Sequence, residues 1–116
     1  MFYKKDARQI ANEYAGAIIN AYPVDKVILF GSYVNGTPNE WSDIDVGVVI
    51  NGFNGDWLST MSRLMRIRRD IDTDIEPHLL DENNDRSGFC EHVLKTGEII
   101  YQKPSKGEDT DEYRRN

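Results

Sequence analysis

Two short apolar segments on either side of a polar loop most strongly constrain what this chain can fold into. The first, Lys26–Phe30, reads KVILF and stops at Gly31, and the second, Asp43–Ile50, reads DIDVGVVI. Apolar runs of this length that contain β-branched residues are typical of buried strands. We therefore expect two strands joined by a loop over residues 31–41, which has room for one helical turn.

Helical periodicity surrounds these two strands. From about Lys4 to Tyr22, apolar residues recur at steps of three and four, which predicts an amphipathic helix ended by Pro23. Asp56 is placed to cap a second helix that runs to about Arg69. The side of this second helix expected to face the core consists of Leu58, Met61, Leu64, Met65 and the stem of Arg68.

The remaining segments complete the expected fold. Ile71–Leu79 alternates apolar and acidic residues with a period of two, which predicts a third strand with one acidic face. A short helix closed by Gly97 and a final short strand over Ile99–Tyr101 follow. We expect an α/β (α+β) fold with a mixed sheet of three or four strands and helices mainly on one face. Residues 1–102 form the domain, and residues 103–116 read as a disordered tail.

Composition excludes several classes of protein. A net charge of −6 and an isoelectric point near 4.8 oppose tight binding to DNA or RNA, since a phosphate backbone favours a basic surface. No apolar run is long enough to cross a membrane, and the N-terminus does not resemble a secretory signal, so a cytosolic protein is expected. Cys90 is the only cysteine, which excludes an internal disulfide and favours a buried structural thiol.

The candidate chemistry lies where the first strand ends and the second begins. A glycine directly after a strand, here Gly31, allows a polyphosphate to approach the backbone, and Ser32 adds a hydroxyl and N–H groups for its oxygens. Ten residues later come Asp43 and Asp45, which point the same way in a strand. Two carboxylates on one face are suited to one or two Mg²⁺ ions that also bind substrate phosphates.

A third carboxylate is needed to complete a second metal position or to accept a proton from an attacking hydroxyl. The acidic face of the expected third strand supplies three candidates: Asp72, Asp74 and Glu76. The two histidines, His78 and His92, lie fourteen residues apart without a second pair, so we interpret both as ordinary polar or packing residues.

The residues LFGSYVNG at 29–36 and WSDIDV at 41–46 resemble the G-S-x10-D-x-D signature of the DNA polymerase β-like nucleotidyltransferase superfamily, in its minimal branch. The resemblance spans roughly residues 10–101 and implies a small nucleotidyltransferase fold. It implies that Gly31 and Ser32 contact a triphosphate, that Asp43 and Asp45 bind metal, and that ATP is the nucleotide donor. The third acid of the family lies in a hydrophobic-acid-hydrophobic strand, which Glu76 matches best and Asp74 second.

The chain departs from the family pattern at two places. Many members carry arginine in the turn after the serine, where this chain has Tyr33 and Asn35, and the third acid is usually Asp rather than Glu. Minimal members resemble antitoxins encoded beside HEPN-type toxins, and some adenylylate a toxin tyrosine. The resemblance therefore implies a HEPN-type partner protein whose hydroxyl receives AMP.

Two other functions remain open at this point. One is a non-catalytic, antitoxin-like protein that keeps the fold and neutralises its partner by contact. The other, transfer to a small molecule such as an aminoglycoside or to RNA, generally requires an added domain, and the acidic charge further opposes RNA.

Overall fold

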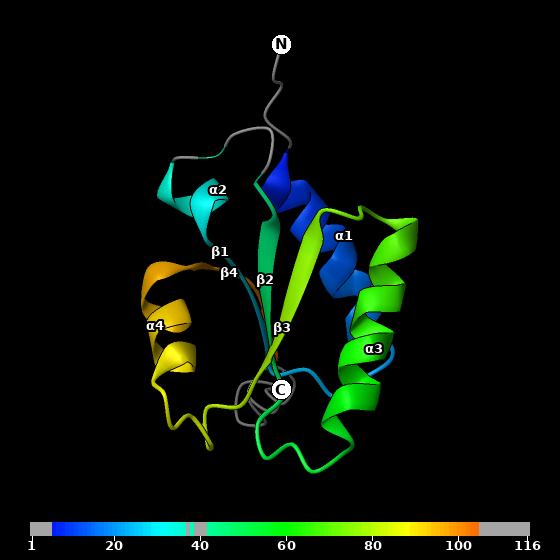
Figure 1. The fold of residues 1–116 in the computed structure, drawn as a ribbon, viewed down its shortest axis with the longest axis vertical. Coiled ribbons are helices and arrows are strands. Elements are labelled where there is room, and N and C mark those ends of the chain that lie inside the picture. The colour runs from blue at the N-terminus through cyan, green and yellow to red at the C-terminus, as the bar shows by residue number, and fades with distance from the viewer. Residues whose placement is uncertain (1–5, 37, 39–41, 105–116) are drawn as a thin grey trace, which may run out of the picture.

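The computed structural model describes residues 6–36, 38 and 42–104 and contains a four-stranded sheet in the order β3-β2-β1-β4 (Figure 1). The described elements are α1 Ala7–Ile19, β1 Lys26–Phe30, α2 Ser32–Asn35, β2 Ile44–Val49, α3 Trp57–Ile67, η1 Arg68–Asp70, β3 Ile75–Leu80, α4 Phe89–Thr96 and β4 Glu98–Gln102. The first strand has the expected bounds, and the loop after it contains the expected single turn of helix as α2.

The sheet is mixed, as expected. β1 pairs antiparallel with β2 and with β4, and β2 pairs parallel with β3. Because parallel neighbours need a crossover, the chain leaves β2, passes through α3 and returns along β3 in the same direction. This crossover brings two segments that are thirty residues apart into register.

Helices cover the sheet unequally. Figure 1 shows the long helices α1 and α3 together on one face of the sheet and the shorter α4 on the other, below α2. The larger core lies under α1 and α3 and includes the fully buried Tyr14, Val46 and Leu64. The smaller core lies under α4 and includes Val93 and Cys90, so the single thiol is buried as expected.

The third strand begins later than the sequence analysis expected, at Ile75 rather than Ile71. The Nη1 group of Arg68 donates hydrogen bonds to the carbonyls of Thr73 and Ile75, both at 2.9 Å, and so holds the preceding residues in a turn. Within that turn the carboxylate of Asp72 accepts a hydrogen bond from the backbone of Asp74. The expected acidic strand face is therefore wrong, and Glu76 is the one of its three acids that lies in the strand.

The expected packing face of α3 also needs correction. Its N-cap is Asp56, as expected, which accepts a hydrogen bond from the backbone of Ser59. Leu58 is 77% exposed, however, and the fully buried side of the helix is formed by Thr60 and Leu64. Residues four apart share one side of a helix, and the hydroxyl of threonine hid this stripe from a search based on hydrophobicity.

The end of the described chain is attached to the sheet. The backbone N–H of Lys103 donates a 2.8 Å hydrogen bond to the carbonyl of Asp25. The tail expected over residues 103–116 otherwise lies outside the described residues, from 105 on. None of the helices in the described ranges is both long and apolar enough to cross a membrane.

A polar cluster joins the ends of three strands away from α2. The Nζ atom of Lys26 lies 3.1 Å from both carboxylate oxygens of Glu82, and the side-chain amide of Asn51 donates to the same carboxylate at 2.8 Å. The side chains of Lys26 and Glu82 are only 22% and 29% exposed. The amide of Asn51, followed by Lys26, lowers the pKa of Glu82 against the opposing effect of burial.

We predict that Glu82→Gln lowers the free energy of unfolding by roughly 1–2 kcal/mol at pH 7, because it removes charge-assisted hydrogen bonds. The folded pKa lies below the ordinary value of 4.5, so this stabilisation is complete above that value and is lost as the pH falls through the folded pKa. Urea unfolding at pH 7 and in steps below pH 4.5 should show the two proteins converging. Glu98→Gln is the control, since its pair with Arg8 is exposed and should matter little.

Candidate active site

The parallel pairing of β2 with β3 places Asp45 directly beside Glu76. Alternate residues of a strand share a face, and both side chains lie on the α4 side of the sheet, opposite the buried Ile44 and Ile75. Asp43 is exposed just before β2, and its side chain shares a hydrogen bond with Glu76. Three carboxylates named by the sequence analysis thus meet at one end of the sheet.

The electrostatics of this cluster favour a cation. Burial, the hydrogen bond with Asp43 and the negative charges of Asp45 and Asp43 all raise the pKa of Glu76, and only the nearby His78 opposes them. Burial and negative neighbours both disfavour the ionised carboxylate, so a bound cation would stabilise it. Carboxylate oxygens are the ligands that Mg²⁺ prefers, so the donor set fits this ion.

Gly31 fits against Asp45 because it lacks a side chain. It follows Phe30, which pairs with Asp45 in the sheet, and has a φ of 83°. A Cβ atom at this position would overlap the Asp45 carboxylate. Ser32 then begins α2, in which the carbonyl of Gly31 accepts hydrogen bonds. The glycine-serine turn expected to contact phosphate therefore lies against one of the acids expected to bind metal.

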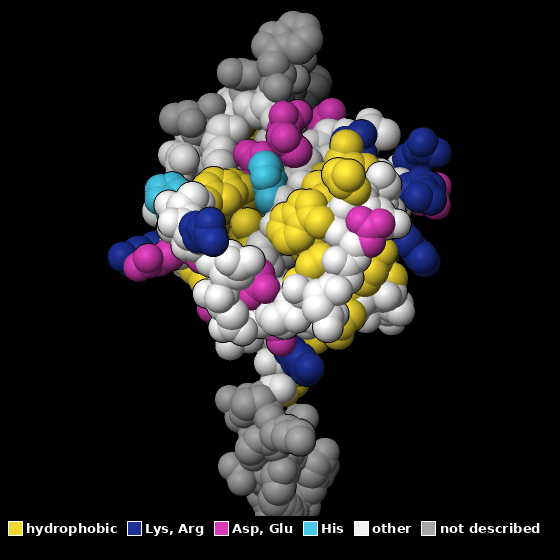
Figure 2. Space-filling view, turned by 60° about the horizontal axis from the view of Figure 1, so that its bottom comes forward, with side chains coloured by type: hydrophobic (Ala, Val, Ile, Leu, Met, Phe, Trp, Pro, Cys, Tyr) yellow, Lys and Arg dark blue, Asp and Glu magenta, His cyan; other side chains and the backbone are white. Residues whose placement is uncertain are grey.

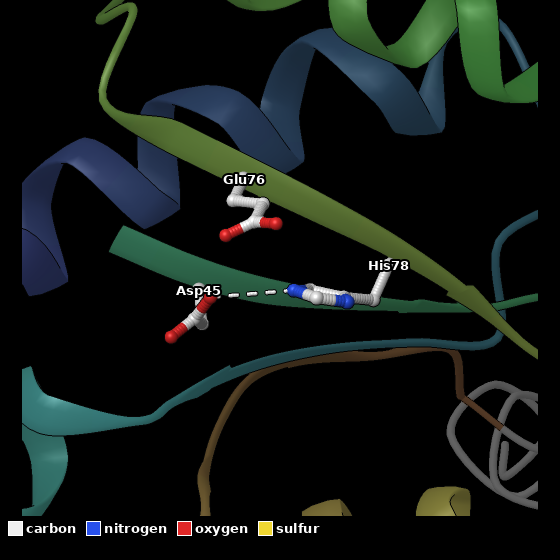
Figure 3. Close-up of side chains that lie close together, drawn as sticks. All are labelled: Asp45, Glu76 and His78. Carbon is white, nitrogen blue, oxygen red and sulfur yellow. Dashed lines mark hydrogen bonds and ion pairs between the residues drawn. The ribbon is translucent and has the colours of Figure 1, made fainter. Parts of the chain in front are cut away.

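The structure adds His78 to this cluster. From the sequence, His78 was interpreted as an ordinary polar or packing residue. Its Nε2 atom lies 3.3 Å from Oδ1 of Asp45, and Figure 3 shows both side chains pointing toward the space in front of Glu76. One ligand atom from each of these three residues lies within 4.8 Å of the other two. The signal available in the sequence was the two-residue spacing of Glu76 and His78 in one strand.

Aromatic side chains border the cluster. The ring of His78 packs against Phe30 and Phe89, with ring centroids 5.1 and 6.0 Å away. Figure 2 shows acidic side chains gathered beside a histidine, with hydrophobic side chains on this same face. Phe89 of α4 and Trp57 of α3 are 40% and 45% exposed. The polar site therefore ends where an apolar part of the surface begins.

Comparison with known proteins identifies the family of this fold. The profile of the family described as "Polymerase beta, Nucleotidyltransferase" matches residues 13–106. The chain belongs to this nucleotidyltransferase family. The fold expected from the sequence, a small nucleotidyltransferase fold around a mixed sheet, is thereby confirmed. A search among curated proteins finds no match.

Solved structures of similar proteins share the fold of this nucleotidyltransferase domain. A candidate nucleotidyltransferase from Sulfolobus solfataricus aligns with a TM-score of 0.63 and 23% identity, over 87% of this chain and 91% of that one. A toxin-antitoxin MntA-HpeT mutant aligns at 0.61 and 21%, over 85% and 77%. A toxin-antitoxin with AMP-PNP aligns at 0.60 and 22%, over 84% and 77%. At these identities the likeness concerns the fold alone.

Within the nucleotidyltransferase domain, the candidate residues separate into two groups. Gly31 and the carboxylates of Asp43, Asp45 and Glu76 lie together, with Ser32 directly after the glycine. Asp74 instead lies in the turn before β3, where its carbonyl accepts a 2.8 Å hydrogen bond from the backbone of Ile44. The geometry thus favours Glu76 over Asp74 as the third acid. His92 is exposed on α4.

We predict that Gly31→Ala destabilises the protein more than Gly36→Ala. Gly36 has φ 83° and ψ 17°, a left-handed conformation that disfavours alanine by about 1 kcal/mol, whereas Gly31 has φ 83° and ψ −154°, a region essentially restricted to glycine. At Gly36 none of the described atoms lies within 4 Å of an added Cβ, whereas at Gly31 it meets Asp45. Overpacking and the backbone conformation together should cost Gly31→Ala roughly 1–3 kcal/mol more. Urea unfolding of both variants measures the difference, and equal losses would contradict the close approach.

Proposed function

We propose that this chain is a Mg²⁺-dependent nucleotidyltransferase that moves a nucleoside monophosphate, AMP from ATP, onto a hydroxyl of a partner protein. The observation that carries the proposal is the meeting of Asp43, Asp45 and Glu76 beside the turn at Gly31. Membership of the nucleotidyltransferase family supports transfer as the reaction class. A cytosolic location, where ATP is present, is part of the proposal.

Each residue has a role in this proposal. Asp43, Asp45 and Glu76 would hold one or two Mg²⁺ ions, which supply positive charge to the phosphate oxygens when bound. Gly31 leaves the backbone open to a triphosphate, and the N–H and hydroxyl of Ser32 donate to its oxygens. These groups orient the α-phosphate for in-line attack by the acceptor hydroxyl.

In the proposed transfer, one bond to phosphorus forms and one breaks. The acceptor oxygen forms a bond to the α-phosphorus, the bond from that phosphorus to the bridging oxygen breaks, and pyrophosphate leaves. The acceptor proton must pass to a base. Where Asp43 and Asp45 hold the metal, Glu76, which lies beside Asp45, is the carboxylate placed to accept this proton.

We infer that the partner is a HEPN-type toxin neutralised by this chain. Two of the structurally similar proteins are toxin-antitoxin structures, and one of them was solved with the ATP analogue AMP-PNP. The resemblance of the glycine-serine and D-x-D motifs to minimal nucleotidyltransferases supports the same partner.

A specific observation keeps the contact-only antitoxin as a second candidate. In this chain Tyr33 stands where many family members carry a cationic arginine, and it packs against the main core. The triphosphate would then bind with less positive charge beside it. A protein of this kind would keep its partner inactive by forming a complex, without transferring AMP.

We predict that Asp43→Asn combined with Asp45→Asn abolishes AMP transfer while the protein remains folded. Both side chains reach solvent, and removing two like charges relieves repulsion in the metal-free protein. The purified chain is incubated with ATP, Mg²⁺ and the product of the adjacent gene, and the intact masses of both proteins are recorded. Glu13→Gln, an exposed acid on α1, is the control and should transfer normally.

The outcomes separate the two candidates. A gain of AMP on the partner that the double variant loses and Glu13→Gln keeps identifies a protein adenylyltransferase. A stable complex with no mass gain favours the contact-only antitoxin. Unchanged transfer by the double variant would remove Asp43 and Asp45 from the mechanism.

We predict that Glu76→Gln weakens Mg²⁺-ATP binding by at least about tenfold, whereas Asp74→Asn leaves it nearly unchanged. The two variants remove one negative charge each from acids two residues apart, but only Glu76 lies beside Asp45. The shift in melting temperature produced by Mg²⁺ with ATP measures the affinity. The reverse order would make Asp74 the third acid.

A further inference from the structure

His78 stands out among the groups that the proposed function does not use. It lies in β3 two residues after Glu76, and it directs its ring toward Asp45 of the neighbouring strand (Figure 3). Of the acid and histidine side chains in the described ranges, Asp45, Glu76 and His78 form the one group able to offer three ligand atoms to a single ion. The nitrogen atom in this set changes which metals it suits.

We propose that His78 is a metal ligand and that, with Asp45 and Glu76, it forms a position selective for first-row transition-metal ions such as Mn²⁺, Co²⁺ and Zn²⁺ over Mg²⁺. The inference deepens the proposed function, because Asp45 and Glu76 serve as ligands in both. It concerns metal binding alone, and its test needs neither AMP transfer nor a partner protein.

The spacing of the donor atoms supports shared coordination. Two atoms bound to one ion at about 2.1 Å, with an angle of 90–110° between the bonds, are about 3.0–3.4 Å apart. Nε2 of His78 and Oδ1 of Asp45 are 3.3 Å apart, which falls within this range. The carboxylate of Glu76 completes a triangle whose sides do not exceed 4.8 Å.

The surroundings hold the imidazole ring in place. The rings of Phe30 and Phe89 pack against it at interplanar angles of 60° and 56°, which limits its rotation away from the carboxylates. The side chains of His78 and Asp45 are nevertheless 28% and 24% exposed. A bound ion would therefore keep access to solvent oxygen, as ions in catalytic sites do.

The chemistry of the donors gives the selectivity. Mg²⁺ prefers an all-oxygen shell and binds nitrogen poorly, whereas imidazole is a good ligand for zinc and other first-row transition ions. An all-carboxylate site of the same charge would discriminate less among these metals. A site in which His78 supplies a nitrogen ligand should thus favour the transition-metal ions over Mg²⁺. Mg²⁺ can still bind there through the carboxylates of Asp45 and Glu76.

Co²⁺ is the probe of choice, because its visible absorption reports the ligands directly. The metal-free full chain is titrated with Co²⁺, and the same chain is titrated with Mg²⁺ in the presence of ATP, followed by melting temperature. His78→Gln keeps an amide able to donate to Asp45 but removes the imidazole. His92→Gln is the matched control, since His92 is exposed on α4 and outside the cluster.

We expect His78→Gln to lose at least about tenfold in Co²⁺ affinity and to change the Co²⁺ spectrum, with Mg²⁺-ATP binding within about twofold of the unsubstituted chain. His92→Gln should match the unsubstituted chain in both titrations. An equal loss for both metals would overturn the inference and make His78 a residue that only positions Asp45. Unchanged Co²⁺ affinity in His78→Gln would overturn it as well.

Two further results keep this inference separate from the proposed function. If the unsubstituted chain binds Mg²⁺ with ATP but not Co²⁺, the inference fails and the proposed function stands. If the unsubstituted chain binds Co²⁺ through His78 but fails to transfer AMP, the inference stands and the proposed function fails. Should His78→Gln not fold, the ¹⁵N shift of Nε2 in the unsubstituted chain decides the matter, since it must move when Zn²⁺ is added if His78 is a ligand.

Discussion

The parallel pairing of β2 with β3 is the constraint on which the site depends. It fixes Asp45 opposite Glu76, and a slip of β3 by one residue would exchange Glu76 with the buried Ile75 on the other face. Such a slip would bury a charge and expose a large apolar side chain. The hydrophobic core under α1 and α3 therefore determines which way the acids point, although it contains none of them.

The face of the sheet that carries Asp45 and Glu76 changes from polar to apolar along its length. In β2 the side that carries Asp45 continues to Gly47 and the buried Val49, and in β3 Glu76 continues through His78 to Leu80. The absence of a side chain at Gly47 allows close packing under α4, since an added Cβ would lie 3.1 Å from Leu80 and 3.4 Å from Val93 of α4. Helix α4 can thus cover the apolar end while the acidic end remains open, and the rings around His78 lie at the boundary.

The features that the sequence predicted well are those set by local chemistry. The bounds of Lys26–Phe30 and the cap at Asp56 depend on a few neighbouring residues, and each was found as expected. The start of β3 depended on Arg68, which binds carbonyls five and seven residues later, and the packing side of α3 depended on a buried Thr60. Hydrophobic periodicity shows neither a side-chain-to-backbone hydrogen bond nor a buried hydroxyl. The predicted start of β3 was therefore wrong, and the predicted face of α3 was right for Met61 and Leu64 but wrong for Leu58.

The candidate site likewise combines residues that are close together in the sequence with residues that only strand pairing brings close. Gly31, Ser32, Asp43 and Asp45 lie close together in the sequence, and their spacing alone identified them. The third acid and His78 lie about thirty residues further on, and their distance from Asp45 is set by the crossover through α3. Sequence spacing named three acidic candidates, and only the family resemblance ranked Glu76 first, because the position of each acid relative to Asp45 depends on strand register. The register that places Glu76 beside Asp45 also brings His78 within 3.3 Å of it, so the third acid and the imidazole follow from one pairing.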